Sequence, residues 1–126
     1  MASPAALSQT VSGGGINKKN LVVKEWNTNA RGVAGTLDHL TTYSPEGKKI
    51  EEIEYDSLGK QKWRKRYEWG ANGLLARELV YDDRNRLVNY KKFEFNEFGK
   101  KKVQYTYDAK GRLISTKVYE YITSGD

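Results

Sequence analysis

Apolar and aromatic residues alternate with polar ones along most of the chain from residue 43 onward. A period of two places every second side chain on the same face of an extended backbone, so the pattern predicts β-strands. The alternating runs are about seven or nine residues long, which is typical of strands and too short for stable helices. Clusters containing Gly, Asn or Asp separate the runs, as expected for hairpin turns. The pattern therefore predicts an all-β chain folded as an antiparallel meander.

The pattern itself repeats with a period of 26 residues. Residues 43–120 divide into three blocks of equal length without a gap, and the blocks keep glycines, Tyr-Asp pairs and aromatic-Glu pairs in register. The aromatic residues that open successive blocks are Tyr43, Trp69, Phe95 and Tyr121. Since each block has room for two strands, we predict tandem two-strand repeats in which each strand pairs with its neighbours in sequence.

Each block carries two turn signals, in which an aromatic residue is followed by three variable residues and then by Gly or Asn. Gly and Asn tolerate the positive φ that closes a type I turn with a bulge, and an Asp side chain can accept hydrogen bonds from nearby backbone amides. Asp56, Asp82 and Asp108 occupy equivalent positions in these turns. We therefore assign them a turn-stabilising role, with paired catalytic carboxylates or calcium ligands as the alternative.

Alternation within the strands predicts one aromatic face and one charged face. We expect Tyr55 to lie opposite Gln61 across the first turn, which would place Glu52 opposite Arg64. The aromatic face is the candidate ligand-binding surface, and its residues are Trp63, Tyr67, Trp69, Tyr81, Phe93, Phe95, Tyr105 and Tyr107. In the alternative interpretation these side chains form a core, covered by the N-terminal segment, by curling of the sheet or by a second subunit.

Two further strands are expected before the blocks, at residues 21–26 and 36–43, which gives seven or eight strands in an open or curled single sheet. We expect residues 21–122 to form one β-repeat domain, preceded by a flexible leader over residues 1–20 and followed by a frayed tail over residues 123–126. The small residues at the start of the leader are similar to the cleavage region of a secretory signal, although an unrelated start would look the same.

Composition agrees with one small, well-solvated domain. The chain has 126 residues, of which 37% are hydrophobic and 30% charged, and 12% aromatic residues argue against disorder. The net charge of +6 favours contact with polyanions, but acidic and basic residues are interleaved, so we expect a solvated, ion-paired surface and no nucleic-acid partner. No apolar stretch is long enough for a transmembrane helix.

Few residues suit catalysis. There is no cysteine, and His39 is the one histidine, which excludes a Cys/His dyad and a histidine-rich metal site. We expect His39 to be a partly exposed surface residue. The sequence therefore predicts a protein that is not an enzyme and that holds no cofactor or metal.

The run Tyr-Asp-Ala-Lys-Gly-Arg-Leu at residues 107–113 resembles the core of the YD (Rhs-type) repeat, and residues 81–87 give a second, weaker copy. Proteins with YD repeats are secreted or surface-exposed bacterial proteins with long β-sheet shells, and they have been linked to carbohydrate binding. The resemblance implies an extracytoplasmic location, secreted, periplasmic or at the cell surface, and a non-catalytic repeat scaffold. Enclosure of a toxin is not implied, because the chain is too short for a shell.

These observations leave several functions open. The leading prediction is a protein-interaction or cell-envelope scaffold that binds a protein or a glycan at the envelope, with a homodimer through a sheet face or edge as a possible form. The first alternative is a carbohydrate-binding module that uses the aromatic face. The second is nucleic-acid or polyanion binding, and the third is a hydrolase built on the turn aspartates.

Overall fold

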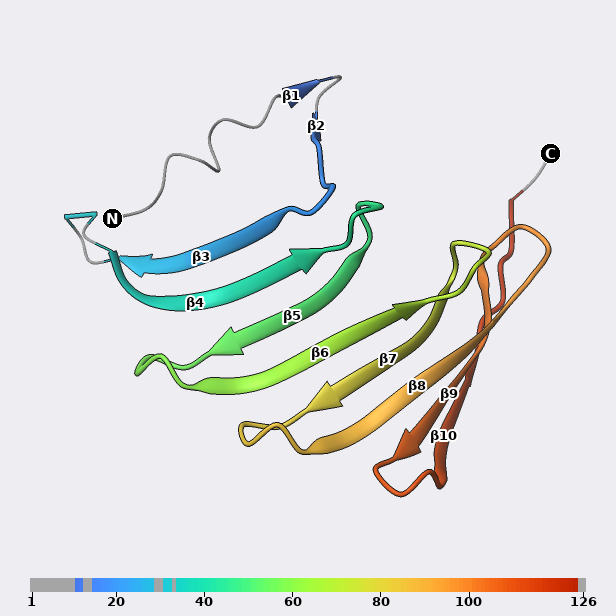
Figure 1. Ribbon diagram of the computed structural model, residues 1–126. Helices are drawn as coiled ribbons and strands as arrows, with labels where there is room; N and C mark the ends of the chain where they lie inside the picture. The colour runs from blue at the N-terminus through green and yellow to red at the C-terminus, as the bar shows by residue number, and fades with distance from the viewer. Residues whose placement is uncertain (1–10, 13–14, 29–30, 33, 125–126) are drawn as a thin grey trace.

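The computed structural model describes residues 11–12, 15–28, 31–32 and 34–124, and within them the chain forms ten strands and no helix. Eight strands form one open sheet and the first two form a separate small hairpin (Figure 1). The strands are β1 (Val11–Ser12), β2 (Gly15–Ile16), β3 (Val22–Thr28), β4 (Ala34–Tyr43), β5 (Lys49–Tyr55), β6 (Gln61–Trp69), β7 (Leu75–Tyr81), β8 (Leu87–Phe95), β9 (Lys101–Asp108) and β10 (Leu113–Val118).

The large sheet is a meander, because its spatial order, β10-β9-β8-β7-β6-β5-β4-β3, follows the order in sequence and all neighbours are antiparallel. The predicted all-β, open-sheet meander is therefore confirmed. The strands expected at residues 21–26 and 36–43 are β3 and β4. The hairpin of β1 and β2 lies in the segment expected to be a flexible leader, and residues 1–10 of that segment lie outside the described residues. Strands β3 and β10 form the two edges of the sheet.

The hairpin turns have the geometry that the sequence predicts. In the turn after β5, the Asp56 amide donates to the Lys60 carbonyl at 2.7 Å, and the Gly59 amide donates to the Asp56 carbonyl at 2.9 Å. Gly59 has a φ of 80°, a left-handed conformation that glycine adopts without strain. The Asp56 Oδ1 atom accepts the amides of Leu58 and Lys60, both at 2.9 Å.

The same arrangement closes most of the other turns. Asp82, Asp108 and Asn96 each accept two backbone amides through Oδ1. Ser44 does so through its hydroxyl oxygen. The turn-stabilising role predicted for the three aspartates is thus confirmed, and the equivalent Asn96 shows that a neutral side chain can fill it.

Each turn that joins consecutive strands from β4 to β10 is followed by a β-bulge, and this changes the pairing expected from the sequence. Tyr55 pairs with Gln61 as predicted, but the next pair is Glu54 with Trp63, so Lys62 is the extra residue. The prediction that Glu52 lies opposite Arg64 is therefore wrong, since Glu52 pairs with Lys65. A bulge inserts one residue in one strand, and beyond it the pairing is displaced by one position.

The prediction of a single aromatic face is also wrong, because the displaced register places aromatic residues on both faces of the sheet. Side chains that pair across neighbouring strands lie on the same face, and the pairs assign the aromatic residues to both faces. One face, here called the tryptophan face, contains Trp63, Tyr67, Trp69, Phe93 and Phe95. The other, the tyrosine face, contains Tyr81, Tyr90, Tyr105 and Tyr107.

The sheet is a single layer, and little of it is removed from water. Leu79 is the one buried hydrophobic residue among the described residues, with 8% of its surface exposed. Stability must therefore come from neighbours on each face. On the tyrosine face, Tyr90 and Tyr107 stack with ring centroids 5.0 Å apart, and the Arg64 guanidinium lies 4.5 Å from the Tyr81 ring centroid.

We predict that Leu79→Ala lowers the free energy of unfolding by about 2–3 kcal/mol, because the substitution removes buried apolar surface at the centre of the sheet. The matched control is Leu58→Ala in a turn, where the side chain is 77% exposed and the change should stay within about 0.5 kcal/mol. Urea denaturation followed by circular dichroism measures both. Equal losses for the two variants would contradict a central role for Leu79.

The turn aspartates should make stability depend on pH. The amides of Lys60, Arg86 and Arg112 hold the pKa values of Asp56, Asp82 and Asp108 below their ordinary value. A carboxylate whose pKa is lower in the folded state contributes stability above its unfolded pKa and loses that contribution as the pH falls through the folded pKa.

The urea midpoint of the natural chain should thus fall as the pH is lowered below about 4. The triple variant Asp56→Asn/Asp82→Asn/Asp108→Asn should fold, as Asn96 fills the same role, and should show a flatter midpoint between about pH 5 and about pH 2. An equally steep fall in the triple variant would assign the pH dependence to other carboxylates.

Candidate functional site

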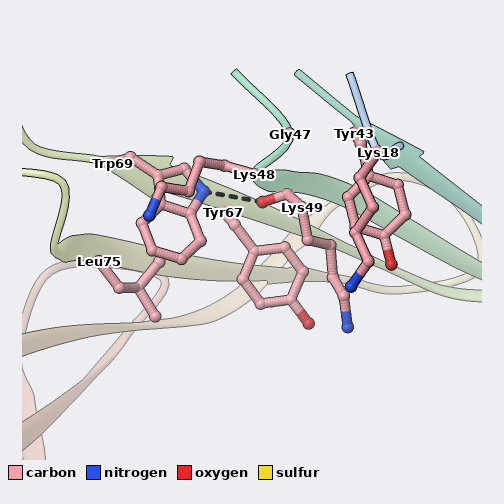
Figure 2. A pocket seen from close by; sticks show the side chains of 8 residues that line it. All are labelled: Lys18, Tyr43, Gly47, Lys48, Lys49, Tyr67, Trp69 and Leu75. Carbon is pink, nitrogen blue, oxygen red and sulfur yellow. Dashed lines mark hydrogen bonds between the residues drawn. The ribbon is translucent and has the colours of Figure 1, made fainter. Parts of the chain in front are cut away.

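The tryptophan face is hollowed where lysine and aromatic side chains meet around the turn between β4 and β5 (Figure 2). The cavity has a volume of about 430 Å³. We call it the lysine–aromatic hollow, and its lining residues are Lys18, Tyr43, Gly47, Lys48, Lys49, Tyr67, Trp69 and Leu75.

The repeat positions the aromatic side chains of the hollow. Tyr67 and Trp69 are two residues apart near the end of β6, so both project from the same face, and Leu75 pairs with Trp69 across the next strand. The Trp69 Nε1–H group donates to the Lys49 carbonyl at 2.8 Å, which holds the indole in place. The equivalent aromatic residue two blocks later, Tyr121, likewise donates its hydroxyl to the Lys101 carbonyl at 2.7 Å.

Each lysine of the hollow lies over one aromatic ring. The Nζ atoms of Lys18, Lys48 and Lys49 are 5.5, 4.8 and 5.6 Å from the ring centroids of Tyr43, Trp69 and Tyr67, respectively. Attraction between an ammonium group and the face of a ring holds such pairs together. The hollow therefore combines three cations with the apolar faces of three rings.

Lys18 comes from outside the repeats. It belongs to a turn that is tied to the sheet where the Asn20 amide donates to the Ser44 carbonyl at 2.9 Å. Asn20 adopts a left-handed φ of 57°, and the turn packs against Gly47, where an added Cβ would lie 3.7 Å from the Lys18 Cβ. The segment predicted to be a flexible leader, residues 1–20, is thus hydrogen-bonded to the β-repeat domain at its C-terminal end.

The charges in the hollow are only partly compensated. The Lys49 Nζ lies 3.4 Å from Glu52 Oε1, whereas the Lys48 Nζ donates to the neutral Gly73 carbonyl at 3.3 Å. Among the described residues, no carboxylate lies within ion-pairing distance of Lys18 or Lys48. The hollow therefore carries positive charge that Glu52 compensates only in part.

A polar cluster centred on Glu52 borders the hollow. The Tyr67 hydroxyl donates to one carboxylate oxygen of Glu52, and His39 Nε2 lies 3.1 Å from the other. Burial by itself raises the pKa of Glu52, but hydrogen bonds from Tyr67, His39 and Lys49 outweigh this and lower it. Burial and the nearby Glu52 carboxylate raise the pKa of the Tyr67 hydroxyl. The cluster fixes the Tyr67 ring, which lines the hollow.

His39 is partly exposed, as the sequence predicts. Its side chain is 16% exposed, and its ring lies edge-on to Trp63 with centroids 5.9 Å apart. His39 thus lies on the tryptophan face between a carboxylate and an aromatic ring.

The structure separates the eight candidate ligand-binding residues into three groups. Tyr67 and Trp69 line the hollow. Trp63, Phe93 and Phe95 share their face but lie outside the hollow, where Phe93 and Phe95 contact each other at 6.3 Å between centroids. The remaining three, Tyr81, Tyr105 and Tyr107, lie on the opposite face.

Sequence reasoning missed most of the hollow's lining. Tyr43 opens the first block exactly as Trp69 opens the second, so the repeat alignment contained the signal for it. Lys48 and Lys49 follow the first turn of that block and could have been found from the same alignment. Nothing in the sequence points to Lys18, because it is brought to the hollow by a turn outside the repeats.

The described residues show no arrangement typical of a metal site. No group of three or more His, Cys, Asp or Glu side chains among them is placed to hold a metal ion. The three turn aspartates are engaged by backbone amides and lie at separate turns. The candidate functional site is the hollow, which brings cations and aromatic rings together.

Comparisons with known proteins give little further guidance. No protein-family model matches the chain, and no curated protein matches it. Among solved structures, one similar chain belongs to the crystal structure of accessory secretory protein 1, 2 and 3 in Streptococcus pneumoniae, with a TM-score of 0.35 and 19% sequence identity. The match covers 75% of this chain and 17% of that one, so this chain spans a small part of that protein's length. The described residues contain no helix long and apolar enough to cross a membrane.

We predict that Tyr67→Phe raises the pKa of Glu52, because the hydroxyl that stabilises the carboxylate is lost. The same change should lower the free energy of unfolding by about 1 kcal/mol. Titration of the glutamate carboxyl carbons by NMR measures the pKa, and Tyr119→Phe is the control, since its hydroxyl contacts Gln104. An unchanged Glu52 pKa in Tyr67→Phe would show that the hydrogen bond is absent in solution.

Proposed function

We propose that the chain is a non-catalytic protein-interaction scaffold of the cell envelope that associates through its C-terminal edge strand, β10. The observation that carries the proposal is the open outer edge of this strand. All six residues of β10 are exposed, and only one side of its backbone is paired.

The backbone of β10 presents regular hydrogen-bonding groups to solvent. The Tyr119 amide donates to the Lys102 carbonyl of β9 at 3.0 Å. Because ladder hydrogen bonds alternate along an antiparallel strand, Ser115 and Lys117 also face β9, and Thr116 and Val118 face outward. Such an edge is a template for another strand.

The other edge of the sheet is less suited to pairing. Strand β3 has two register shifts within seven residues, around Trp26, whereas β10 has a single shift at its start. Irregular edges disfavour the addition of a strand. The β10 edge also carries apolar side chains, since Ile114 and Val118 are 59% and 71% exposed. Pairing is therefore favoured at β10.

A second copy of the chain fits this edge. If two β10 strands pair antiparallel about Thr116, Ile114 of each copy lies opposite Val118 of the other, and Lys117 lies opposite Ser115. The dimer interface then contains two pairs of Ile114 and Val118, and no like charges lie directly opposite each other. The arrangement is a symmetric dimer that joins two sheets into one.

Two features of the sequence support a place at the envelope. The small residues at the start of the chain are similar to the cleavage region of a secretory signal. The resemblance of residues 81–87 and 107–113 to YD repeats points to surface-exposed bacterial proteins, whose repeats serve as scaffolds.

Sedimentation of the natural chain over a range of concentrations tests the proposal, and we expect a reversible dimer. Thr116→Pro removes an outward amide without touching the ladder to β9, so it should abolish the dimer and leave the circular dichroism spectrum unchanged. Thr116→Val, which keeps the amide, is the matched control and should dimerise. A natural chain that stays monomeric, or a Thr116→Pro variant that dimerises, would rule out pairing at this edge.

Carbohydrate binding is a second candidate function, and the lysine–aromatic hollow favours it. Sugar rings commonly bind by packing their C–H faces on aromatic side chains, and Tyr43, Tyr67 and Trp69 come together in one cavity. The eight-residue aromatic platform expected from the sequence is not assembled, so the hollow replaces it as the proposed site. Nucleic-acid binding has less support, because acidic residues such as Glu52 and Glu78 interrupt the basic ones on this face.

A further inference from the structure

We propose that the lysine–aromatic hollow binds an acidic saccharide, meaning a sugar chain that carries carboxylate or sulfate groups. The inference rests on the carbohydrate-binding function and narrows its ligand class. It concerns the hollow alone and is independent of pairing at β10.

The first argument is the unpaired positive charge. Lys18 and Lys48 lie at opposite sides of Gly47 on two turns that pack together, and neither has a carboxylate partner among the described residues. Both ammonium groups instead lie over aromatic rings, 5.5 and 4.8 Å from the centroids. A ligand with spaced negative charges can pair with these ammonium groups and gain charge-assisted hydrogen bonds.

The second argument is the chemistry between the charges. The hollow offers apolar ring surface at Tyr67 and Trp69 and the side chain of Leu75. Sugar C–H faces pack on such apolar surface, while carboxylate or sulfate groups pair with ammonium groups. A glycan with about one charge per ring therefore matches a site in which cations lie beside apolar groups.

The hollow is specific to the first block. At the positions equivalent to Lys48 and Lys49, the second block has Leu74 and Leu75, and no residue in that block corresponds to Lys18. The third block has Lys100 and Lys101, but it too receives no side chain from an additional turn. The repeat by itself therefore does not produce this combination of three cations and three rings.

Isothermal titration at low salt tests the inference with three probes of equal length: an oligomer of galacturonic acid, a sulfated glucan oligomer and the neutral galactose oligomer. We expect the natural chain to bind at least one acidic oligomer about tenfold more tightly than the neutral one. The two acidic probes distinguish carboxylate from sulfate as the preferred group.

Two double variants separate the hollow from general charge attraction. Lys18→Gln/Lys48→Gln should weaken binding of the acidic oligomer by about fivefold or more. Lys60→Gln/Lys110→Gln is the matched control, because it lowers the net charge equally at turns on the opposite ends of the strands, and it should leave the affinity unchanged. Equal weakening in both variants would overturn the inference.

NMR spectra of the natural chain provide a test that needs no variant. The amide signals of Gly47, Lys48 and Trp69 should shift on addition of the acidic oligomer, and those of the turn at Gly111 should not. Equal affinity for neutral and acidic oligomers, with shifts at the hollow, would sink the inference and leave the carbohydrate function standing. Absence of binding to all three probes would reject both.

Discussion

The hydrogen bonds that close each hairpin turn determine the register of the whole sheet. A side-chain oxygen at the start of the turn, as in Asp56, accepts two backbone amides, and a left-handed residue such as Gly59 ends the turn. The bulge that follows displaces the pairing by one residue and thereby decides which side chains share a face. Within the described residues the sheet is a single layer without a packed core, so no second layer selects which side chains share a face.

Interactions between neighbours on each face take the place of a core. Rings stack on rings, as at Tyr90 and Tyr107, and cations lie over rings, as Arg64 does over Tyr81. Each such contact is small, but the repeat provides it again on successive strands, so stability grows with the number of blocks. The long aliphatic stems of Lys and Arg help to shield the sheet while their charges stay in water, which explains why so polar a chain forms an extended sheet.

The single-layer architecture has consequences for function. In the part of the chain that the structure describes, no layer covers the sheet, so the proposed binding surfaces are accessible without rearrangement. The edge of β10 carries exposed apolar side chains, and the lysine–aromatic hollow is positively charged and lies on a face. The two surfaces are separate in the sheet, because the hollow lies near β4 to β6 and β10 is the far edge (Figure 1). The proposed pairing at β10 and the proposed ligand site are therefore compatible in one molecule.

The sequence by itself determined the meander, the turn positions and the role of the turn aspartates, because period-two alternation and turn chemistry are local properties of the chain. It did not determine which residues share a face, since a bulge such as the one at Ala76 places Tyr81 and Trp69 on opposite faces of the sheet without changing the alternation within either strand. Only the tertiary structure brought Lys18 to Tyr43, because that contact depends on the packing of a turn outside the repeats against Gly47.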